Sequence, residues 1–364
     1  MIMSKVASGA TLRDVAAAAG VSLASASCAL GQGRRGVSDQ MRERVQRAAS
    51  ELGYEVRRRG RPRARPLVVG VVVPDATNSF FSAVLGSLGS ALRREGHRLL
   101  VTESADDPEV EGELVELLSP RVDALAIAPA AELGRATEEL AGRGVPVVLF
   151  DRDGGSAGDH LPAVVMDNRQ SARRGTMVLV ESGFRRIALV NGPQRVSTAR
   201  HRTDGYLRAL AEAGLARDDE LIWTGEFSFD DGRRAVNRLL RAPERPDAIF
   251  SSSAILTSGV LMALREHGLR WPGNLAVVGY GDGVFASLVE PSVTVVEQPT
   301  HAMGETVARL LVDHPVAQPG PTRVVLSSKL VVRDSHWRTP LVGRDGSTAA
   351  GLGREPSLVG EGPR

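Results

Sequence analysis

Residues 11–22 read TLRDVAAAAGVS, and this stretch decides how the amino-terminal part of the chain folds. Thr11, with an acidic residue three positions later, forms a capping box that predicts a helix beginning at Leu12. Gly20 suits the positive φ of a tight turn, and Ser22 is a good cap for a second helix. The two helices are joined by the four residues 19–22, and two short helices with such a connection are typical of a helix-turn-helix.

A third helix is predicted after the second. Ser38 is placed to cap it, and apolar residues recur at helical spacing from Met41 to Leu52 before Gly53 ends it. The head is therefore expected to be an all-α unit of three short helices. A small bundle built around a generic α-hairpin is the alternative, and the charge of the segment disfavours it.

Charge is distributed unevenly along the chain. Residues 1–66 contain 13 Lys or Arg against 5 Asp or Glu, a net of +8, so the other 298 residues sum to −6 of the formal +2. A basic head on a mildly acidic body is typical of a protein that binds a polyanion. The alternative is a solvated charged tail, which the predicted helices of the head disfavour.

Composition limits the possible classes. With 364 residues, 42% of them hydrophobic and 24% charged, the chain is expected to form two or three globular domains. Its longest apolar run, residues 67–73, is too short to cross a bilayer, and no signal peptide is expected. The single cysteine, Cys28, cannot form an intrachain disulfide. We therefore expect a cytoplasmic protein that does not contact a membrane.

Catalytic patterns are missing. The sequence has no phosphate-binding loop, no nucleophile elbow and no metal-spaced cysteine cluster, and its seven histidines are scattered singly. We therefore expect no enzyme activity, no catalytic residues, no metal and no cofactor.

From residue 67 onward the pattern changes to short apolar runs separated by amphipathic helical stretches. Residues 99–101 and 164–166 are two such runs, and both are predicted to be buried parallel strands. Alternating strands and helices build doubly wound sheets, and the length suggests two of them. Ligands of such sheets bind outside the carboxyl ends of the strands, which between two lobes would be a cleft.

The head and body together resemble the LacI/GalR family of transcription regulators. The resemblance is carried by residues 11–22, by Val37-Ser38, and by the motifs RERV at 42–45 and ELGY at 51–54, and it continues to about Val332. It implies a helix-turn-helix head on an α/β body of two doubly wound lobes, like a type I periplasmic-binding-protein fold. The chain would cross between the lobes three times, near residues 151–164, 296–300 and 327–332.

The expected domains follow from the resemblance and the composition. They are a DNA-binding domain at residues 1–56, a basic linker at 57–66, a two-lobed effector-binding and dimerisation domain at 67–339 and a disordered tail at 340–364. Lobe 1 is expected at about residues 67–163 with 300–326, and lobe 2 at about 164–296 with 329–339.

The resemblance places the second helix of the head in the major groove, with Leu23, Ala24 and Cys28 at its base-reading positions. None carries a strong hydrogen-bonding group, so these side chains are expected to read little beyond thymine methyl groups. Cys28 is either a small hydrophobe, the commoner case, or a redox-sensitive thiol. The other residues of the head expected to contact DNA are Thr11, Leu12, Ser22, Ser25 and Ser27.

The linker departs from the family pattern. It lacks the leucine of the family's hinge helix, and Gly60 and Pro62 argue against any helix there. Its Arg-Gly-Arg-Pro core resembles an AT-hook, and a narrow A·T-rich minor groove attracts arginine. A flexible linker with nonspecific attraction for DNA is the alternative. The arginines expected to contact DNA are Arg57, Arg58, Arg59, Arg61 and Arg63.

The resemblance also implies an effector in the cleft, with Arg202 clamping ligand oxygens. The residues expected to contact it are Asp75, Asn78, Phe80, Phe81, Asp151, Arg202, Ser253, Tyr280 and Asp282. Ser253-Ala254 stands where the family usually has Asn-Asp, and Gly281 stands where it usually has an aspartate. Because buried sugar hydroxyls without partners are costly, an ordinary monosaccharide is not expected. A smaller, less hydroxylated or anionic ligand is favoured, and a cleft that binds no ligand is the alternative.

The predicted function is a dimeric DNA-binding repressor whose operator affinity is changed by this small molecule. Its partners would be a pseudo-palindromic double-stranded operator, the effector and a second copy of the chain. A solute-binding module is disfavoured by the helix-turn-helix. An architectural protein that prefers A·T-rich DNA and lacks effector control stays open, because Leu23, Ala24 and Cys28 read little and the linker is rich in arginine.

Overall fold

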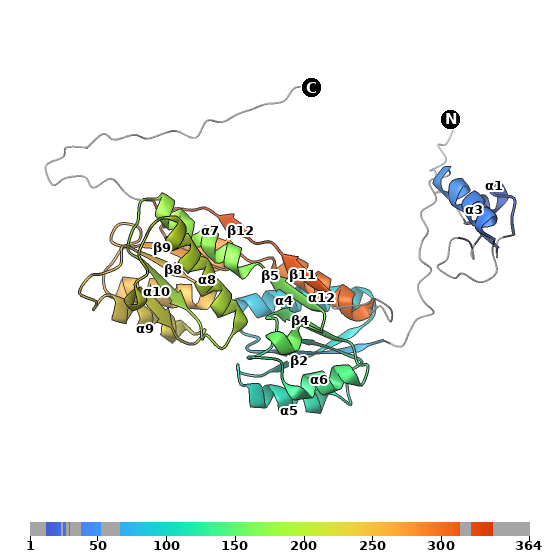
Figure 1. Cartoon of the computed structure of the whole chain (residues 1–364), viewed down its shortest axis with the longest axis horizontal. Helices are drawn as coiled ribbons and strands as arrows, with labels where there is room; N and C mark the ends of the chain where they lie inside the picture. Colours follow the sequence, from blue (N-terminus) through green and yellow to red (C-terminus); the bar gives the residue numbers. More distant parts are fainter. Residues whose placement is uncertain are drawn as a thin grey trace, which may run out of the picture. The chain divides into compact units, whose positions relative to one another are not determined.

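The computed structural model describes residues 12–22, 25, 26, 29, 38–51, 66–313 and 322–337. The chain divides into two compact units, Met1–Arg65 and Pro66–Arg364, which we call the head and the body (Figure 1). Among the described residues, no helix is long and apolar enough to cross a membrane.

The head contains α1 (Leu12–Ala18) and α3 (Asp39–Glu51). The predicted turn is present: Gly20 has φ +62°, and the backbone N–H of Ser25 donates to Ser22 Oγ at 3.1 Å. Both observations fit a cap at Ser22 and the start of the second helix. Small apolar side chains form the core of the head, namely Val15, Ala16, Ala19, Ala26, Ala29, Val45, Ala48 and Ala49.

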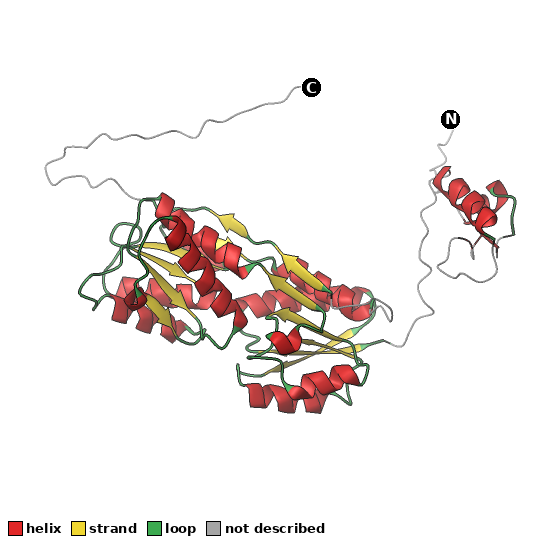
Figure 2. Ribbon diagram, viewed as in Figure 1, coloured by secondary structure: helices red, strands yellow, loops and turns green. Residues whose placement is uncertain are grey.

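The first lobe of the body is a six-stranded sheet in the order β11-β5-β4-β3-β1-β2, with every pairing parallel. Val69 and Val71 pack with residues of α4 and α12, whereas Val72 packs with residues of α5 and α6, so alternate residues of β1 serve the two faces. Helices therefore cover both faces of the sheet (Figure 2). Its strands are β1 (Val68–Val73), β2 (Arg98–Glu103), β3 (Ala124–Ile127), β4 (Val147–Asp151), β5 (Ala163–Met166) and β11 (Arg323–Leu326). Its helices are α4 (Ser79–Arg94), α5 (Pro108–Leu118), α6 (Arg135–Gly142) and α12 (Thr300–Val312).

The second lobe is a six-stranded sheet in the order β12-β10-β9-β8-β6-β7, parallel except for β12. The helices α7 and α8 pack on one face and α9 and α10 on the other. Its strands are β6 (Ile187–Asn191), β7 (Ile222–Thr224), β8 (Ala248–Ser251), β9 (Ala276–Tyr280), β10 (Thr294–Glu297) and β12 (Lys329–Val331). Its helices are α7 (Asn168–Glu181), α8 (Ser197–Glu212), α9 (Phe229–Leu239), α10 (Ala254–Glu266) and α11 (Val284–Leu288).

One predicted lobe boundary is wrong. The strand at residues 164–166 was expected to begin the second lobe, but Val164 pairs in parallel with Phe150 of β4 and with Val324 of β11. The chain therefore leaves the first sheet after Met166 rather than before Val164. Hydrophobic periodicity identifies a strand but not which neighbours hydrogen-bond to it. The other two crossings fall where they were predicted, between β10 and α12 and between β11 and β12.

The predicted burial of residues 99–101 is also wrong in part. They belong to β2, which lies at the edge of the first sheet, and the side chains of Leu100 and Val101 are 39% and 38% exposed. An edge strand has only one neighbour to cover it, so apolar sequence alone overestimates its burial. The expected tail at residues 340–364 lies outside the described residues.

Candidate functional site

A cleft of about 70 Å³ lies between the two lobes of the body. Most of its lining residues lie at the carboxyl ends of strands of both sheets or in the loops and first helical turns that follow them, as expected for doubly wound sheets. Seven of the nine residues predicted to contact an effector line it: Asp75, Asn78, Phe80, Phe81, Asp151, Arg202 and Ser253.

The loop after β1 supplies the first group of side chains. Asn78 caps α4 by accepting a hydrogen bond from the backbone N–H of Phe80 at 3.0 Å through Oδ1. Asp75 is held by Thr77, whose backbone N–H and hydroxyl donate to Asp75 Oδ1 at 2.8 and 2.6 Å. Phe80 packs edge-on against Phe81, with ring centroids 5.1 Å apart. These contacts fix the loop, so the aromatic and polar groups are presented to the cleft together.

Asp151 ends β4 and carries a buried carboxylate. Its side chain is 7% exposed, and Oδ1 has no hydrogen-bond partner among the described residues. Burial raises the pKa of Asp151 above its ordinary value, an effect opposed by the nearby guanidinium groups of Arg202 and Arg152. A buried acceptor without a partner is costly, so this oxygen suits a hydrogen-bond donor of a bound molecule.

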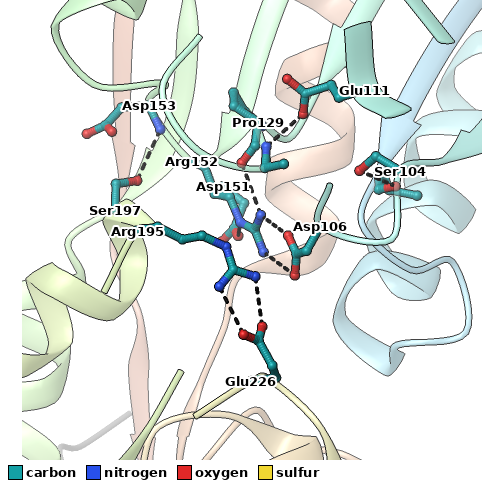
Figure 3. Close-up of polar contacts among 12 residues, drawn as sticks. Ser104, Asp106, Glu111, Pro129, Asp151, Arg152, Asp153, Arg195, Ser197 and Glu226 are labelled. Atoms are coloured by element: carbon teal, nitrogen blue, oxygen red, sulfur yellow. Dashed lines mark hydrogen bonds and ion pairs between the residues drawn. The ribbon is translucent and has the colours of Figure 1, made fainter. Parts of the chain in front are cut away.

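Arg152 follows directly and also lines the cleft. Its Nη1 donates to the carbonyl of Pro129 at 3.0 Å and to Asp106, while its Nη2 reaches the other oxygen of Asp106 at 3.4 Å (Figure 3). Its Nε is buried and has no hydrogen-bond partner among the described residues. An unpaired donor and an unpaired acceptor therefore lie on neighbouring residues of one wall.

Arg202 reaches the cleft from α8 and is held from behind. Its Nε donates to Asn168 Oδ1 at 2.9 Å and its Nη1 to the carbonyl of Ser252 at 2.7 Å. The guanidinium lies over the ring of Tyr280, 4.1 Å from the centroid. Tyr280 is fully buried, does not line the cleft, and donates to Asn168 Oδ1 at 3.2 Å. Its predicted role as a ligand contact is replaced by a role in positioning Arg202.

Asp282 does not join the predicted site. Both of its carboxylate oxygens accept from Arg333 Nη2, at 2.8 and 2.9 Å, and it does not line the cleft. Gly281 precedes it with φ +82°, a left-handed conformation that turns the chain at the end of β9. Ser253 does line the cleft, and its Oγ caps α10 by accepting from the backbone N–H of Leu256 at 3.3 Å.

Sequence reasoning missed several lining residues. Phe227 and Gln298 follow β7 and β10, so the rule that ligands bind at carboxyl strand ends could have found them. Arg152 had no such signal, because successive residues of a strand point to opposite faces. The other lining residues not predicted are Pro74, Asp106, Thr198 and Ala254.

The rim of the cleft carries further polar contacts, drawn in Figure 3. Arg195 and Glu226 of the second lobe form a two-pronged ion pair at 2.9 and 2.8 Å. The backbone N–H of Asp153, in the first lobe, donates to Ser197 Oγ, in the first turn of α8, at 3.5 Å. A polar contact thus links the lobes beside the cleft.

The predicted DNA-reading surface lies largely outside the described part of the chain. Ser22 and Ser25 are described, and their hydroxyls lie 2.8 Å apart at the start of the second helix. Leu12 is the first residue of α1. The other predicted contacts lie outside the described residues: Thr11, Leu23, Ala24, Ser27, Cys28, Arg57, Arg58, Arg59, Arg61 and Arg63. Within the described residues, no cluster of His, Cys, Asp or Glu could hold a metal ion.

Comparisons with known proteins match both parts of the chain. The family model "Bacterial regulatory proteins, lacI family" matches residues 11–56, and "Periplasmic binding proteins and sugar binding domain of LacI family" matches residues 66–314. The transcriptional regulator CelR of Thermobifida fusca is 35% identical, over 89% of this chain and 98% of its own length. The repressor CytR of Escherichia coli K12 is 29% identical, over 93% of this chain and 100% of its own length. A solved CelR–cellobiose complex superposes with a TM-score of 0.69 at 34% identity, covering 90% of this chain and 99% of that one.

Proposed function

Because this chain belongs to the LacI family of bacterial regulatory proteins, we propose that it is a dimeric transcriptional repressor that releases DNA when a small molecule occupies the cleft. One observation carries the proposal. A helix-turn-helix head is joined to a body in which two sheets direct the carboxyl ends of their strands at one cleft. A ligand that binds one arrangement of the lobes better than another shifts the population between them, and so can change DNA affinity.

A carbohydrate is the effector class that the cleft supports best. The solved CelR complex contains cellobiose, and the cleft of this chain combines phenylalanines with carboxylates, guanidiniums, Thr198 and Gln298. Apolar ring faces and hydrogen-bonding groups together suit sugar rings. Thr198, Gln298 and Asp106 also line the cleft, although the sequence did not predict them. They supply polar groups in addition to those expected, which offsets the polar side chains that the family usually has at positions 253, 254 and 281 and this chain lacks.

DNA recognition would combine the head with the basic linker. Ser22 and Ser25 suit phosphate contacts, which position a protein without specifying a sequence. Arg61 and its neighbours would lie in an A·T-rich minor groove at the centre of the operator. Two heads on one dimer would bind the two halves of a pseudo-palindrome. Such a regulator would act in the cytoplasm, where bacterial DNA lies.

Exposed apolar side chains support a dimer. Leu100 and Val101 lie exposed on the edge strand β2 of the first lobe, while Val284 and Leu288 are 74% and 77% exposed on α11 of the second. Burying such groups in a second copy would remove apolar surface from water at about 25 cal/mol per Å². Both lobes would then contribute to the interface, so a ligand that moves one lobe against the other would also move the two heads.

Selection of bound sequences from a random DNA pool by the full-length protein at near-physiological salt tests the proposal. A palindromic motif is expected, with an A·T-rich centre if the arginines of the linker read the minor groove. Enrichment of A·T content with no fixed register would instead identify an architectural protein, because such binding follows base composition and salt rather than one site.

A further inference from the structure

The loop of residues 104–107, which joins β2 to α5, has an unfavourable backbone conformation. Ala105 and Asp106 have φ values of +53° and +59°, and two consecutive residues other than glycine rarely adopt this left-handed region. The backbone N–H of Ala105 donates to the carbonyl of Pro74 at 3.0 Å, and Asp107 caps α5. Such a conformation persists where contacts with the surrounding structure maintain it.

Arg152, in the turn after β4, makes a contact of this kind. Its side chain is 4% exposed, and both of its Nη atoms pair with the carboxylate of Asp106. Its Nη1 also donates to the carbonyl of Pro129 at 3.0 Å. The guanidinium of Arg152 therefore ties the loop of residues 104–107 to the loop that follows β3.

Glu111, in the first turn of α5, contacts the other end of the same peptide group. The carbonyl of Pro129 and the N–H of Ala130 belong to one peptide bond, and Glu111 Oε2 accepts from that N–H at 2.7 Å (Figure 3). The residue is 2% exposed, and burial raises its pKa from 4.5 to about 7. Glu111 and Arg152 are thus coupled through one peptide group as well as by their charges.

The charges around Glu111 oppose one another. Arg152 lowers the pKa of Glu111 and Asp106 raises it. Of the elements that pack against α5, β1 has no charged residue, and on α6 Arg135 pairs with Glu139 at 2.7 Å on the surface. Without its proton, Glu111 would be a second carboxylate facing the guanidinium of Arg152. The other charged residues of α5 and α6 are exposed, namely Glu109, Glu113, Glu116 and Glu138.

We propose that Glu111 is a proton-controlled switch for the loop of residues 104–107. With a proton on Glu111, Arg152 pairs with Asp106 and the left-handed loop is held. When the proton leaves, the buried carboxylate repels Asp106 and attracts Arg152, so the ion pair weakens and the loop opens more often. Because Asp106 and Arg152 line the cleft, the proton also controls how often this wall of the cleft is in place. The switch acts whether or not the cleft holds a ligand.

Proton linkage gives the direction and size of the effect. With a pKa of about 7 in the held loop and the ordinary value of 4.5 in the opened loop, raising the pH from 6 to 8 favours opening about tenfold. Hydrogen exchange detects this change even when the opened loop is rare.

Hydrogen–deuterium exchange of the full-length protein at pH 6 and pH 8 tests the proposal. It is read by mass spectrometry and corrected for the pH dependence of intrinsic exchange. Peptides that cover residues 104–110 are expected to open about tenfold more often at pH 8. At both pH values they should open more often than peptides of β3, which report unfolding of the whole lobe.

Three variants separate the switch from a general loss of stability. Glu111→Gln cannot ionise and its amide oxygen can still accept from Ala130, so its loop should open equally often at both pH values. Asp106→Asn removes the ion pair, so its loop should open more often than that of the unaltered protein already at pH 6. Glu116→Gln, which removes an exposed carboxyl from the same helix, is the control and should keep the tenfold difference.

The proposal is overturned if the loop of the unaltered protein opens equally often at pH 6 and pH 8, or no more often than β3. It is also overturned if Glu111→Gln keeps the pH dependence, or if Asp106→Asn exchanges like the unaltered protein at pH 6. None of these results bears on repression, because operator selection from the DNA pool is scored at one pH and succeeds or fails independently.

Discussion

Replacing Glu111 by glutamine should make the body more stable at neutral pH, because this buried carboxyl resists ionisation. Glu111 lies in the first turn of α5, its residue is 2% exposed, and its Oε2 accepts from the backbone N–H of Ala130 at 2.7 Å. Burial raises its pKa from 4.5 to about 7, more than the hydrogen bond from Ala130 and the charge of Arg152 lower it.

The sign follows from proton linkage. Between about pH 4.5 and 7 the folded protein keeps a proton on Glu111 that the unfolded chain has lost, so stability falls as pH rises through this range. The whole shift is worth about 3 kcal/mol, of which roughly 2.5 kcal/mol develops between about pH 5 and pH 8. Glutamine is neutral at every pH, and its amide oxygen can still accept a hydrogen bond from the backbone N–H of Ala130. The stability of Glu111→Gln should therefore lack the fall with rising pH that the ionisation of Glu111 causes.

Urea unfolding of both proteins from pH 5 to pH 8 measures the effect. The stability of the variant relative to the unaltered protein should increase by roughly 2 to 3 kcal/mol over this range. Glu116→Gln, which removes an exposed carboxyl from the same helix, should show little change. A stability difference between Glu111→Gln and the unaltered protein that is the same at pH 5 and pH 8 would contradict a raised pKa at Glu111.

Three further predictions concern the cleft, the linker and the dimer. Sugar affinity should fall as pH falls through the raised pKa of Asp151, because a hydroxyl group of the sugar donates to the ionised carboxylate. Titration calorimetry should show this dependence of affinity on pH, and Asp151→Asn should remove it. Tighter sugar binding at acidic pH would contradict the prediction. Replacing Arg61 and Pro62 by alanine should remove the A·T preference at the centre of the selected sites, and an unchanged preference would leave the linker as a nonspecific attractor. Leu100→Asp should raise the dimer dissociation constant about tenfold or more in sedimentation experiments, given the worth of a buried leucine; an unchanged constant would place the interface elsewhere.

Much of the fold was predictable because local chemistry decides it. A capping serine at Ser22 and a glycine with positive φ at Gly20 are visible in the sequence and serve the turn of the head. Alternating apolar runs likewise predict the two doubly wound sheets. The lobe of β5 could not be predicted in this way, because the hydrogen bonds that assign Val164 to the first sheet come from strands about 15 and 160 residues away.

Site residues were predictable where they lie at the carboxyl ends of strands. Their prediction failed where contacts between residues distant in the sequence decide which side chains reach the cleft. Asp75 and Asn78 follow β1 and Asp151 is the last residue of β4, and all three line the cleft. Asp282 also follows a strand, but Arg333, about 50 residues away, pairs with it instead. Arg152 was missed because the left-handed turn at Asp151 reverses the strand alternation.

Coupling between the cleft and the head is measured by the affinity of the full-length protein for its selected operator, determined by fluorescence anisotropy with and without a saturating neutral sugar. We expect the sugar to weaken operator binding by about 5- to 150-fold, the usual range of coupling between two sites. Arg202→Met should abolish this response and keep the operator affinity measured without sugar. Operator affinity that is unchanged or tightened when a sugar occupies the cleft would contradict the expected weakening.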